Sequence, residues 1–464
     1  MSVEAMPASG RPQTGSRERN ASDALIHVDN FEAINTLITR PLLDRGDWRR
    51  WWLALALSGV LTLVFFGGAV YLFVEGIGIF GNNSTVVWGF PIANYVWWIG
   101  IGNAGTLISS LLLLTHQKWR AAINRFAEAM TLMAVAIAGI FPIMHMGRPL
   151  YFYWLFPYPN IQSLWPQWRS ALIWDFWAIL SYLLFSIIFW YTGLIPDVAT
   201  LRDRAAKRWK KVIFGVMALG WRNSARHWHA YETYYFTMAA LAVPLVCSVH
   251  SIVGLDFAAS LMPGWQEPIF PPYFVLGAMY SGFAMVVLLA ALVRWGLQLE
   301  SVITVRHFDL MAKIMLVAAW IMLLSYMTEW FSGWYGGREA DRSFLVFQFT
   351  GTYGWLYWIM IFCNCIAAQA FWFPAFRRNI WWVVAIGLLI NVGMWLERIL
   401  IVWNTLAHAY EPSMWHIFVP TLWDWLILAG SLGFFAFMYL LFVRLFPVAS
   451  MHEVRQLLHE EKTS

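Results

Sequence analysis

The sequence has little charge for its length. Asp, Glu, Lys and Arg make up 12% of the 464 residues, which is about half the share that is usual in soluble domains. Hydrophobic residues make up 60%. A water-soluble globule could not bury that much apolar surface, so lipid must solvate much of the chain. The same composition excludes a disordered chain, a fibrous repeat and a disulfide scaffold.

Cysteine is also scarce. Cys247, Cys363 and Cys365 are the three cysteines, all lie in apolar segments, and the sequence contains no Cys-x-x-Cys pair. A structural zinc site or a four-cysteine iron–sulfur cluster needs more thiolates than these. We therefore expect no metal site within the chain and interpret the cysteines as small core residues.

The first 24 residues contain no apolar run, so no signal peptide is predicted there. Residues 25–50 are amphipathic and lead into the basic and aromatic string Asp47-Trp48-Arg49-Arg50-Trp51-Trp52. Such a flank is typical of a membrane interface. We expect residues 1–50 to form a cytoplasmic polar tail and an interfacial arm.

Ten stretches are long and apolar enough to cross a membrane as helices. They run over residues 52–74, 95–114, 127–145, 170–192, 231–253, 272–293, 309–330, 352–373, 380–403 and 424–446. The sequence thus predicts an all-α integral membrane protein with ten transmembrane helices.

The distribution of Lys and Arg predicts the orientation. If the N-terminus is inside, the inner segments hold 26 of the 31 Lys and Arg residues and the outer loops hold four. This asymmetry follows the positive-inside rule and predicts that both termini face the cytoplasm. Because these cations are spread over loops rather than gathered in one stripe with interleaved aromatics, nucleic acid is not an expected partner.

The spans can be grouped by a weak internal repeat. Phe90-Pro91 precedes Gly100 and Gly105, as Phe270-Pro271 precedes Gly277 and Gly282. The pattern favours two parallel four-helix bundles, made of helices two to five and six to nine, with helices one and ten beside them. Small residues at such spacing also permit close helix packing without any repeat. The corresponding segments are 51–94 (first helix and outer loop), 95–256 (first bundle), 257–405 (second bundle) and 406–464 (last helix and cytoplasmic tail).

Ionisable side chains inside a bilayer are costly and are candidates for function. His145, Asp175, His250 and Asp256 come from three consecutive helices of the first predicted bundle, near their outer ends. Each has a structural interpretation as well, since a helix-end His often bonds a carbonyl group and Asp175 could serve the helix dipole. Their convergence at one predicted depth favours a functional site.

Two carboxylates and two imidazoles suit the oxidation of a quinol, which releases two protons and two electrons. A partly buried carboxylate or His can accept the hydroxyl proton. The electrons need a carrier, and the chain has no ligand set for one apart from His145 and His250. An outer partner should therefore supply the carrier.

Several strings resemble a known family. They are HMGRPLYFYWLFPYPN (145–160), SALIWDFWA (170–178), LIPDVATLRDRA (194–205), SARHWHAYET (224–233), SVHSIVGLDF (248–257), IFPPYFVLGAMYSGFAM (269–285) and NVGMWLERILIV (391–402). Together they resemble the NrfD/polysulfide-reductase membrane-subunit family over residues 25–446. Within it they look most like the C membrane subunit of bacterial alternative complex III, and the paralogous F membrane subunit has the same ten-helix plan.

The resemblance implies a subunit without a redox metal of its own, whose substrate is menaquinol or ubiquinol. It implies an iron–sulfur partner at the outer, periplasmic face, a paralogous ten-helix subunit, and c-type cytochrome subunits that hold the haems. Carried over residue by residue, the quinol-site positions match His145, Asp175, His250 and Asp256, with Arg148 a weaker match.

The resemblance also implies proton translocation through the bundles. Glu128 and Lys313 lie at the predicted inner ends of two helices, and Glu329 and the pair Glu397-Arg398 lie toward outer ends. These are the candidate proton-path residues. Each also fits an interfacial position, and Glu397-Arg398 fits a structural ion pair.

Two other classes compete with the quinol interpretation. His145 and His250 could bind one haem axially, as in a cytochrome b-type carrier. Repeated bundles with polar groups also occur in secondary transporters, usually with broken helices at mid-membrane. No prominent Gly/Pro break at mid-membrane is predicted here.

The outer loops are rich in aromatic residues and Pro, as in Trp154 through Trp168 and Trp265 through Tyr273. Aromatic residues favour protein interfaces, but they also form the aromatic belt of membrane proteins. These loops are therefore interpreted either as a docking face for the outer partner or as part of the aromatic belt.

Overall fold

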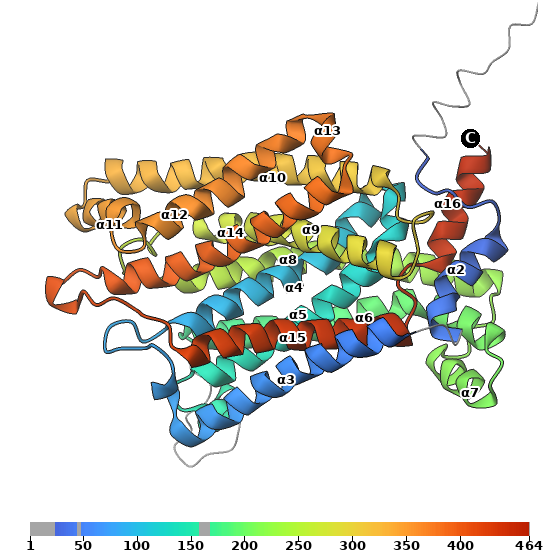
Figure 1. Cartoon of the computed structure of the whole chain (residues 1–464), viewed down its shortest axis with the longest axis horizontal. Coiled ribbons are helices and arrows are strands. Elements are labelled where there is room, and N and C mark those ends of the chain that lie inside the picture. The colour runs from blue at the N-terminus through green and yellow to red at the C-terminus, as the bar shows by residue number, and fades with distance from the viewer. Residues whose placement is uncertain (1–23, 44–47, 157–167, 464) are drawn as a thin grey trace, which may run out of the picture.

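The computed structural model describes residues 24–43, 48–156 and 168–463, and regular structure in these ranges is entirely helical (Figure 1). Ten segments are long and apolar enough to cross a membrane, which confirms the ten predicted spans. They are α3 (Arg49–Glu75), α4 (Phe90–Leu114), α5 (Asn124–His145), α6 (Ala171–Arg204), α8 (Ala225–Ala258), α9 (Phe270–Gly296), α10 (Val305–Tyr335), the composite segment Gly354–Trp372, α14 (Ile380–Ala407) and α15 (Leu422–Leu445). The helices α6 and α8 extend past their predicted inner ends, as far as Arg204 and back to Ala225.

Shorter helices lie at the two ends of the stack. At one end, on the right of Figure 1, lie α2 (Phe31–Leu43), α7 (Arg208–Met217) and α16 (Met451–Thr463). At the other end lies α11 (Glu339–Thr350). The remaining short elements are η1 (Ile77–Ile79), η2 (Lys118–Ala122), η3 (Pro149–Leu155), α13 (Pro374–Arg377) and η6 (Pro412–Met414).

Helices α4 and α9 form the centre of the molecule. Helix α4 packs against α5, α8, α9 and α14, and α9 packs against α4, α8, α10 and α14. Two small residues permit this approach. A Cβ atom on Gly282 would lie 1.8 Å from the Cβ of Ala104, and one on Gly105 would lie 2.0 Å from the carbonyl oxygen of Ala127. The expected close packing at Gly105 and Gly282 is confirmed.

Helix α3 pairs with α15 along one side of this centre. Its outward side chains are apolar and exposed, as at Leu53, Leu57, Leu63 and Val70. On a helix as apolar as α3, such a face is suited to lipid rather than to water.

The eighth span is not a regular helix. Helix α12 (Gly354–Ile361) passes into a π-helical turn, η4 (Phe362–Ile366), and then into a 3₁₀ segment, η5 (Ala367–Trp372). The prediction concerned Gly/Pro breaks, and this irregular stretch contains neither Gly nor Pro. It packs closely against α14, because a Cβ atom on Gly393 would lie 2.2 Å from the amide oxygen of Asn364.

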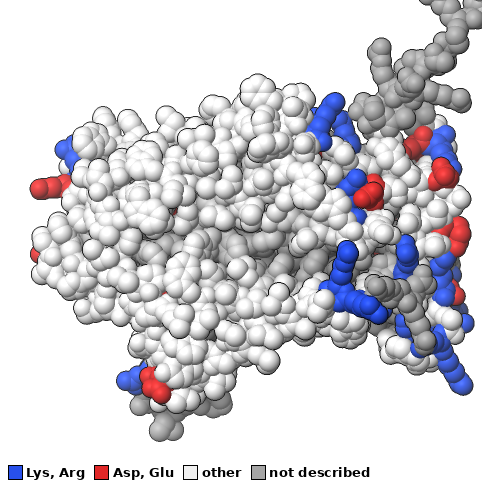
Figure 2. Space-filling view, viewed as in Figure 1, with Lys and Arg blue, Asp and Glu red and all other residues white. Residues whose placement is uncertain are grey.

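Charged side chains occupy the two ends of the molecule. Figure 2 shows Lys and Arg gathered at the end with α2, α7 and α16, and few charges at the opposite end. The surface between them is almost uncharged in this view. That band is the expected surface of a multi-pass membrane protein.

Candidate functional site

A cavity opens between α4, α5, α6 and α8 at the end of the molecule remote from α16. Three of the predicted site residues line it, namely His145, Asp175 and Asp256, together with the unpredicted Tyr95. The rest of the lining is largely apolar: Trp88, Ile92, Val96, Pro142, Met146, Leu155, Phe176 and Phe257. A mostly apolar cavity with a few converging polar groups is the usual form of a small-molecule site.

Helix α4 and helix α6 bring the main polar pair together. The Tyr95 hydroxyl donates a 2.6 Å hydrogen bond to Oδ2 of Asp175. The Asp175 side chain is buried, and its Oδ1 atom has no hydrogen-bond partner among the described residues. One carboxylate oxygen is therefore held in place, and the other receives no hydrogen bond from a donor group of the described residues.

Asp256 in the last turn of α8 supplies a second carboxyl group. It adjoins Asp175, within hydrogen-bonding reach of it, and one of its oxygens lacks a partner among the described residues. Two adjoining carboxyl groups cannot both ionise cheaply in a buried site, so they can share a proton. This arrangement can receive and hand on protons.

His145 forms a further wall of the cavity, at the end of α5. It is buried, its ring centre lies 6.0 Å from that of Tyr95, and neither ring nitrogen has a hydrogen-bond partner among the described residues. A buried imidazole without a partner is costly unless a ligand or water satisfies it. His145 is thus placed to bind a polar group in the cavity.

His250 does not line this cavity. Its Nδ1 atom lies 2.6 Å from the side-chain nitrogen of Asn103 on α4, and its Nε2 atom has no partner among the described residues. Asn103 is eight residues further along α4 than Tyr95, which corresponds to about 12 Å at 1.5 Å per residue. The common depth predicted for the four residues therefore does not extend to His250, which lies about two turns deeper.

Arg148 is likewise outside the cavity lining. It is exposed and precedes η3, three residues after α5 ends at His145. The sequence places Arg148 beside His145, but the turn after α5 directs its side chain to the surface.

A second polar cluster lies between α9, α10, η4 and α14. Arg398 and Glu397 form a buried ion pair with 3.1 Å between Nη1 and Oε1, as the structural interpretation of this pair predicts. The Tyr326 hydroxyl donates to Glu397, and the Asn364 amide donates to both. Oε1 of Glu397, Nη1 of Arg398 and Oδ1 of Asn364 are buried without a hydrogen-bond partner among the described residues, although the first two form the ion pair.

Phe274 of α9 lies between this cluster and His250. The Arg398 guanidinium lies 4.0 Å from the centre of the Phe274 ring, and the His250 ring centre lies 6.2 Å from it. Gly277 makes the room, because a Cβ atom there would lie 2.7 Å from Arg398 Nη2. His250 and the cluster of Arg398 and Glu397 are therefore neighbours, with the Phe274 ring between them.

Glu329 of α10 lies near the carboxyl groups of Glu267 and Glu397 and near the side chain of Gln348. Glu267 is in the loop between α8 and α9. Burial raises the pKa of Glu267 to about 7, and the nearby Asp341 carboxylate raises it further while Arg338 opposes the rise. A carboxyl group with such a pKa exchanges its proton near neutral pH.

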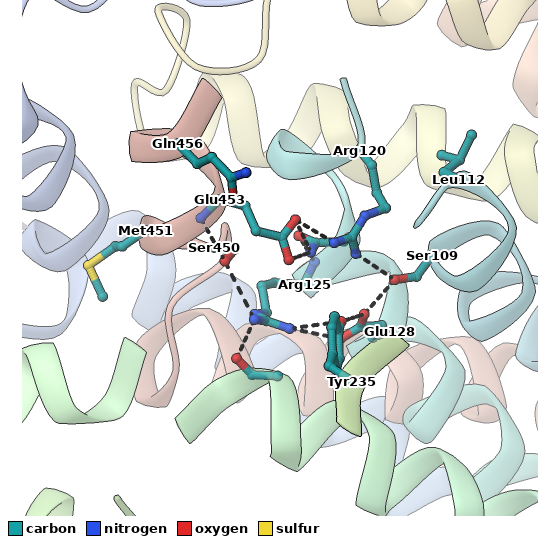
Figure 3. A network of polar contacts seen from close by, with 12 residues as sticks. Ser109, Leu112, Arg120, Arg125, Glu128, Tyr235, Ser450, Met451, Glu453 and Gln456 are labelled. Atoms are coloured by element: carbon teal, nitrogen blue, oxygen red, sulfur yellow. Dashed lines mark hydrogen bonds and ion pairs between the residues drawn. The ribbon is translucent and has the colours of Figure 1, made fainter. Parts of the chain in front are cut away.

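At the opposite end, Glu128 belongs to a buried network (Figure 3). It accepts hydrogen bonds from Ser109 (2.5 Å) and Tyr235 (2.8 Å), and it pairs with Arg125 at 3.2 Å. Arg125 also pairs with Asp197 of α6 at 3.2 Å. Glu128 is therefore a buried member of an ion network, whereas an interfacial position would leave it exposed.

Helix α16 covers this network. Glu453 pairs with Arg120 at 2.7 Å, Ser450 accepts from Arg125, and the Met451 backbone N–H donates to Asp197. The last helix thus completes the network from outside the spans.

Lys313, the other candidate near this end, pairs with Asp309 at 2.8 Å. Asp309 also accepts from Arg377 Nε at 2.7 Å. Lys313 is half-exposed, so it takes part in a peripheral ion cluster.

The predicted aromatic docking loops divide in the structure. Trp265 and Tyr273 are buried, and Trp265 donates to the carbonyl of Ile401, so these two cannot serve as a docking face and the prediction is wrong for them. Tyr151, Tyr153 and Trp154 are exposed. Residues 157–167, the rest of that loop, lie outside the described residues.

No group of three or more His, Cys, Asp or Glu residues is arranged to hold a metal ion within the ranges 24–43, 48–156 and 168–463. The important partners that sequence reasoning missed are Tyr95, Asn103, Arg125 and Asp197. Arg125 and Asp197 carried a signal, because a charged residue beside a long apolar run is costly unless paired. Tyr95 and Asn103 carried none, because polar uncharged residues are common at helix contacts.

Comparisons with known proteins agree with this architecture. The family described as "Polysulphide reductase, NrfD" matches residues 78–410. A putative dimethyl sulfoxide reductase membrane subunit from Halobacterium salinarum is 26% identical over 260 residues, 56% of this chain and 55% of the relative. A selenate reductase subunit from Mesobacillus selenatarsenatis is 22% identical over 243 residues, 50% of this chain and 54% of the relative. The chain spans about half the length of these relatives. Since the family match covers well over half of its residues, this multi-pass membrane protein belongs to the NrfD polysulphide reductase family.

Proposed function

We propose that the chain is the quinol-oxidising membrane subunit of an electron-transfer complex. The observation that carries this proposal is the apolar cavity in which His145, Tyr95, Asp175 and Asp256 converge. A quinol headgroup has two hydroxyl groups on an apolar ring. The cavity offers apolar walls for the ring and proton acceptors for the hydroxyls.

The chemistry assigns a role to each group. Asp175 accepts the proton of one quinol hydroxyl through Oδ1, while Tyr95 holds Oδ2. Asp256 takes this proton onward, and His145 binds the opposite hydroxyl group of the quinol and accepts the second proton. Loss of two protons and two electrons turns the quinol into the quinone.

The electrons pass to an iron–sulfur cluster in a partner subunit. The exposed aromatic group Tyr151, Tyr153 and Trp154 lies close to the cavity in sequence, after His145, and we propose it as part of the docking face. The two relatives are named as subunits of reductases. The family membership and these names support a multi-subunit host.

Two kinds of multi-subunit complex are candidates for the one that contains this chain. The sequence strings favour the C membrane subunit of an alternative complex III, with the F membrane subunit of that complex as its closest alternative. Its partners would be an iron–sulfur subunit, a paralogous ten-helix subunit and c-type cytochromes. The relatives favour a dimethyl sulfoxide or selenate reductase type of complex. Quinol oxidation at this cavity is common to both, with menaquinol or ubiquinol as substrate.

We also propose the orientation and grouping of the helices. The end with α2, α7 and α16 carries most of the Lys and Arg, so it lies in the cytoplasm by the positive-inside rule. The cavity then lies toward the outer face. Helices α4, α5, α6 and α8 form the first bundle, over residues 95–256, and α9, α10, α12 to η5 and α14 form the second, over 257–405. Residues 51–94 and 406–464 supply the flanking helices.

We also propose that the subunit translocates protons. Glu128 is buried at the cytoplasmic end of the first bundle, the pair Glu397-Arg398 is buried in the second, and Glu329 is half-buried there. His250 lies beside the Phe274 ring, which contacts Arg398 of the second bundle. A translocated proton would bind to these groups in turn. Lys313 would lie at the cytoplasmic entry of this proton path.

The purified complex tests the proposal. Reduced menaquinol and ubiquinol analogues should be oxidised anaerobically, with the appearance of reduced iron–sulfur signals in electron paramagnetic resonance. A haem Soret band from the isolated chain would favour the cytochrome b alternative. Solute flux in liposomes that hold only this chain would favour the transporter alternative, and either result without quinol turnover overturns the proposal.

A further inference from the structure

A second cavity lies at the end with α2, α7 and α16. It opens between α2, the end of α6 and the start of α7, and the described residues that line it include four basic side chains and no acidic one. The lining residues are Thr36, Thr39, Arg40, Leu43, Arg204, Ala206, Lys207 and Lys210. None of them belongs to the quinol cavity or to the ion networks described above. The four positive charges in one cavity favour the binding of an anion.

Within the described residues, little of this positive charge is neutralised by ion pairs. Glu32 is the only acidic residue of the described ranges that forms an ion pair with any of the four cations, through two hydrogen bonds from Arg204. Lys210 donates instead to the neutral carbonyl of Leu42 at 2.7 Å, and Arg40 donates to the Gln298 side chain at 3.3 Å.

The field in the cavity is correspondingly positive. Burial lowers the pKa of Lys210, and the charges of Arg444 and Lys207 lower it further. Arg444, at the end of α15, therefore adds to the same field. Bringing an anion into this cavity would relieve the repulsion between these cations.

The neighbouring helix indicates where the anion comes from. Trp209, Val212, Ile213 and Val216 of α7 are all between 48% and 72% exposed. They recur at helical spacing, so they form one apolar face beside the basic residues Lys207 and Lys210. A short helix with a cationic side and an exposed aromatic and aliphatic side is typical of a membrane interface.

Helix α7 is also fixed to a lipid-facing span. The Tyr191 hydroxyl of α6 donates to the carbonyl of Met217 at the end of α7, at 2.7 Å. One to two turns earlier on α6, Leu184, Ile187 and Ile188 are exposed in the apolar band. An acyl chain could therefore follow α6 away from a headgroup in the basic cavity.

We propose that this cavity binds the phosphate of an anionic phospholipid headgroup, with Arg40, Lys207 and Lys210 as the principal contacts. Thr36 and Thr39 line the same cavity and can add hydroxyl contacts to phosphate oxygens. The site is separate from quinol oxidation and goes beyond that proposed function. Its ligand class is a phosphate-bearing anion, which a lipid supplies in the bilayer and free phosphate supplies in solution.

The test is a titration of the purified complex in a neutral detergent. The probes are dioctanoyl phosphatidylglycerol, dioctanoyl phosphatidylcholine and inorganic phosphate, with binding followed by calorimetry. The site variant is Lys207→Gln/Lys210→Gln. The matched control is Arg226→Gln/Arg378→Gln, which removes the same charge from residues that do not line the cavity.

Phosphatidylglycerol should bind the wild-type complex more tightly than phosphatidylcholine does. The site variant should bind it about 30-fold more weakly, at the usual contribution of a cation near a membrane surface, while the control should bind it as the wild type does. Unchanged melting temperatures would show that both variants are folded, and Arg40→Gln provides a second site variant if the first does not assemble. If phosphatidylglycerol binding weakened equally in the site and control variants, the proposal that the lipid binds in this cavity would be overturned. If inorganic phosphate bound as tightly as phosphatidylglycerol, the proposal that a lipid supplies the bound phosphate group would be overturned.

Discussion

Tyr95 of α4 holds Asp175 of α6 through a 2.6 Å hydrogen bond between residues 80 positions apart in the chain. The bond occupies Oδ2 and leaves Oδ1 of the buried carboxyl group without a partner among the described residues. The carboxyl group is therefore oriented before any ligand arrives. Preorientation of this kind is what a general base needs, since geometry comes before proton affinity.

Replacing Asp175 by Asn keeps the shape of the side chain and removes the base. Quinol oxidation by the assembled complex should fall by about 100-fold or more, the usual contribution of a general base. Asp256→Asn should lower it less, because Asp256 acts after the first proton transfer. The measurement is anaerobic turnover of a quinol analogue. Asp203→Asn, at the exposed far end of α6, is the matched control and should be unaffected; a normal rate in Asp175→Asn would remove the assignment.

Tyr95→Phe removes only the hydrogen bond that orients Asp175. Turnover should fall about 3- to 10-fold, which corresponds to the net contribution of one hydrogen bond. The fall should be seen in kcat, with KM changed little, because Tyr95 acts through the carboxylate. Tyr353→Phe, which removes a hydroxyl bonded to the Phe418 carbonyl elsewhere in the molecule, should leave kcat unchanged. A larger loss in Tyr95→Phe than in Asp175→Asn would contradict the assigned order of roles.

His250→Ala tests the depth of the site. Because His250 lies about two turns below the cavity, bonded to Asn103, its loss should lower turnover less than Asp175→Asn does. If the quinol instead binds at His250, the two variants should be equally impaired and KM should rise in His250→Ala. Near-normal turnover in both variants would move the quinol site elsewhere, most plainly to the cluster around Glu329 and Glu397.

The network of Arg125 predicts a large effect on stability. Arg125→Leu leaves the Glu128 and Asp197 carboxyl groups without their shared buried cation. Removing one partner of a buried ion pair costs about 3–5 kcal/mol, so the melting temperature in detergent should fall sharply. Lys118→Leu, which breaks the exposed pair with Glu460, should cost less than about 1 kcal/mol. Equal melting temperatures for the two variants would show that the buried network contributes no net stability.

Glu267 predicts a dependence of stability on pH. Its pKa is raised to about 7 from 4.5, so between these values the folded state keeps a proton that the unfolded state releases. Stability should therefore fall as pH rises through this window. Glu267→Gln removes the ionising group, so its advantage in melting temperature over the wild type should grow from pH 5 to pH 8. The exposed Glu339→Gln should show no such trend, and a constant difference for Glu267→Gln would refute the linkage.

The spans were predictable from sequence because a bilayer demands long apolar helices with satisfied backbone groups. The ten predicted segments correspond to the ten helical spans, and the inner extensions of α6 and α8 were missed because they are polar. The irregular turn at η4 was missed for a different reason. It contains neither Gly nor Pro, and its close approach to α14 joins Asn364 and Gly393, two residues that hydropathy does not relate.

The candidate site was predictable only in part. Buried carboxylates and imidazoles stand out in apolar runs, which identified Asp175, Asp256 and His145. Depth along a helix can be counted, but the rotation and offset of neighbouring helices cannot, so His250 was placed too near the others. Tyr95 was missed because a tyrosine among so many aromatic residues gives no distinct signal until its partner is known.

The covering of the buried network by α16 has a consequence for how the protein is made. Arg120, Arg125 and Asp197 belong to segments that leave the ribosome long before Ser450, Met451 and Glu453. During synthesis these charges are incompletely paired, at the ends of helices that have already been inserted. Release of α16 then supplies the missing contacts in one step. A ribosome that stalls before α16 would leave a membrane protein with an open polar end, a form that quality-control proteases could distinguish from the finished one.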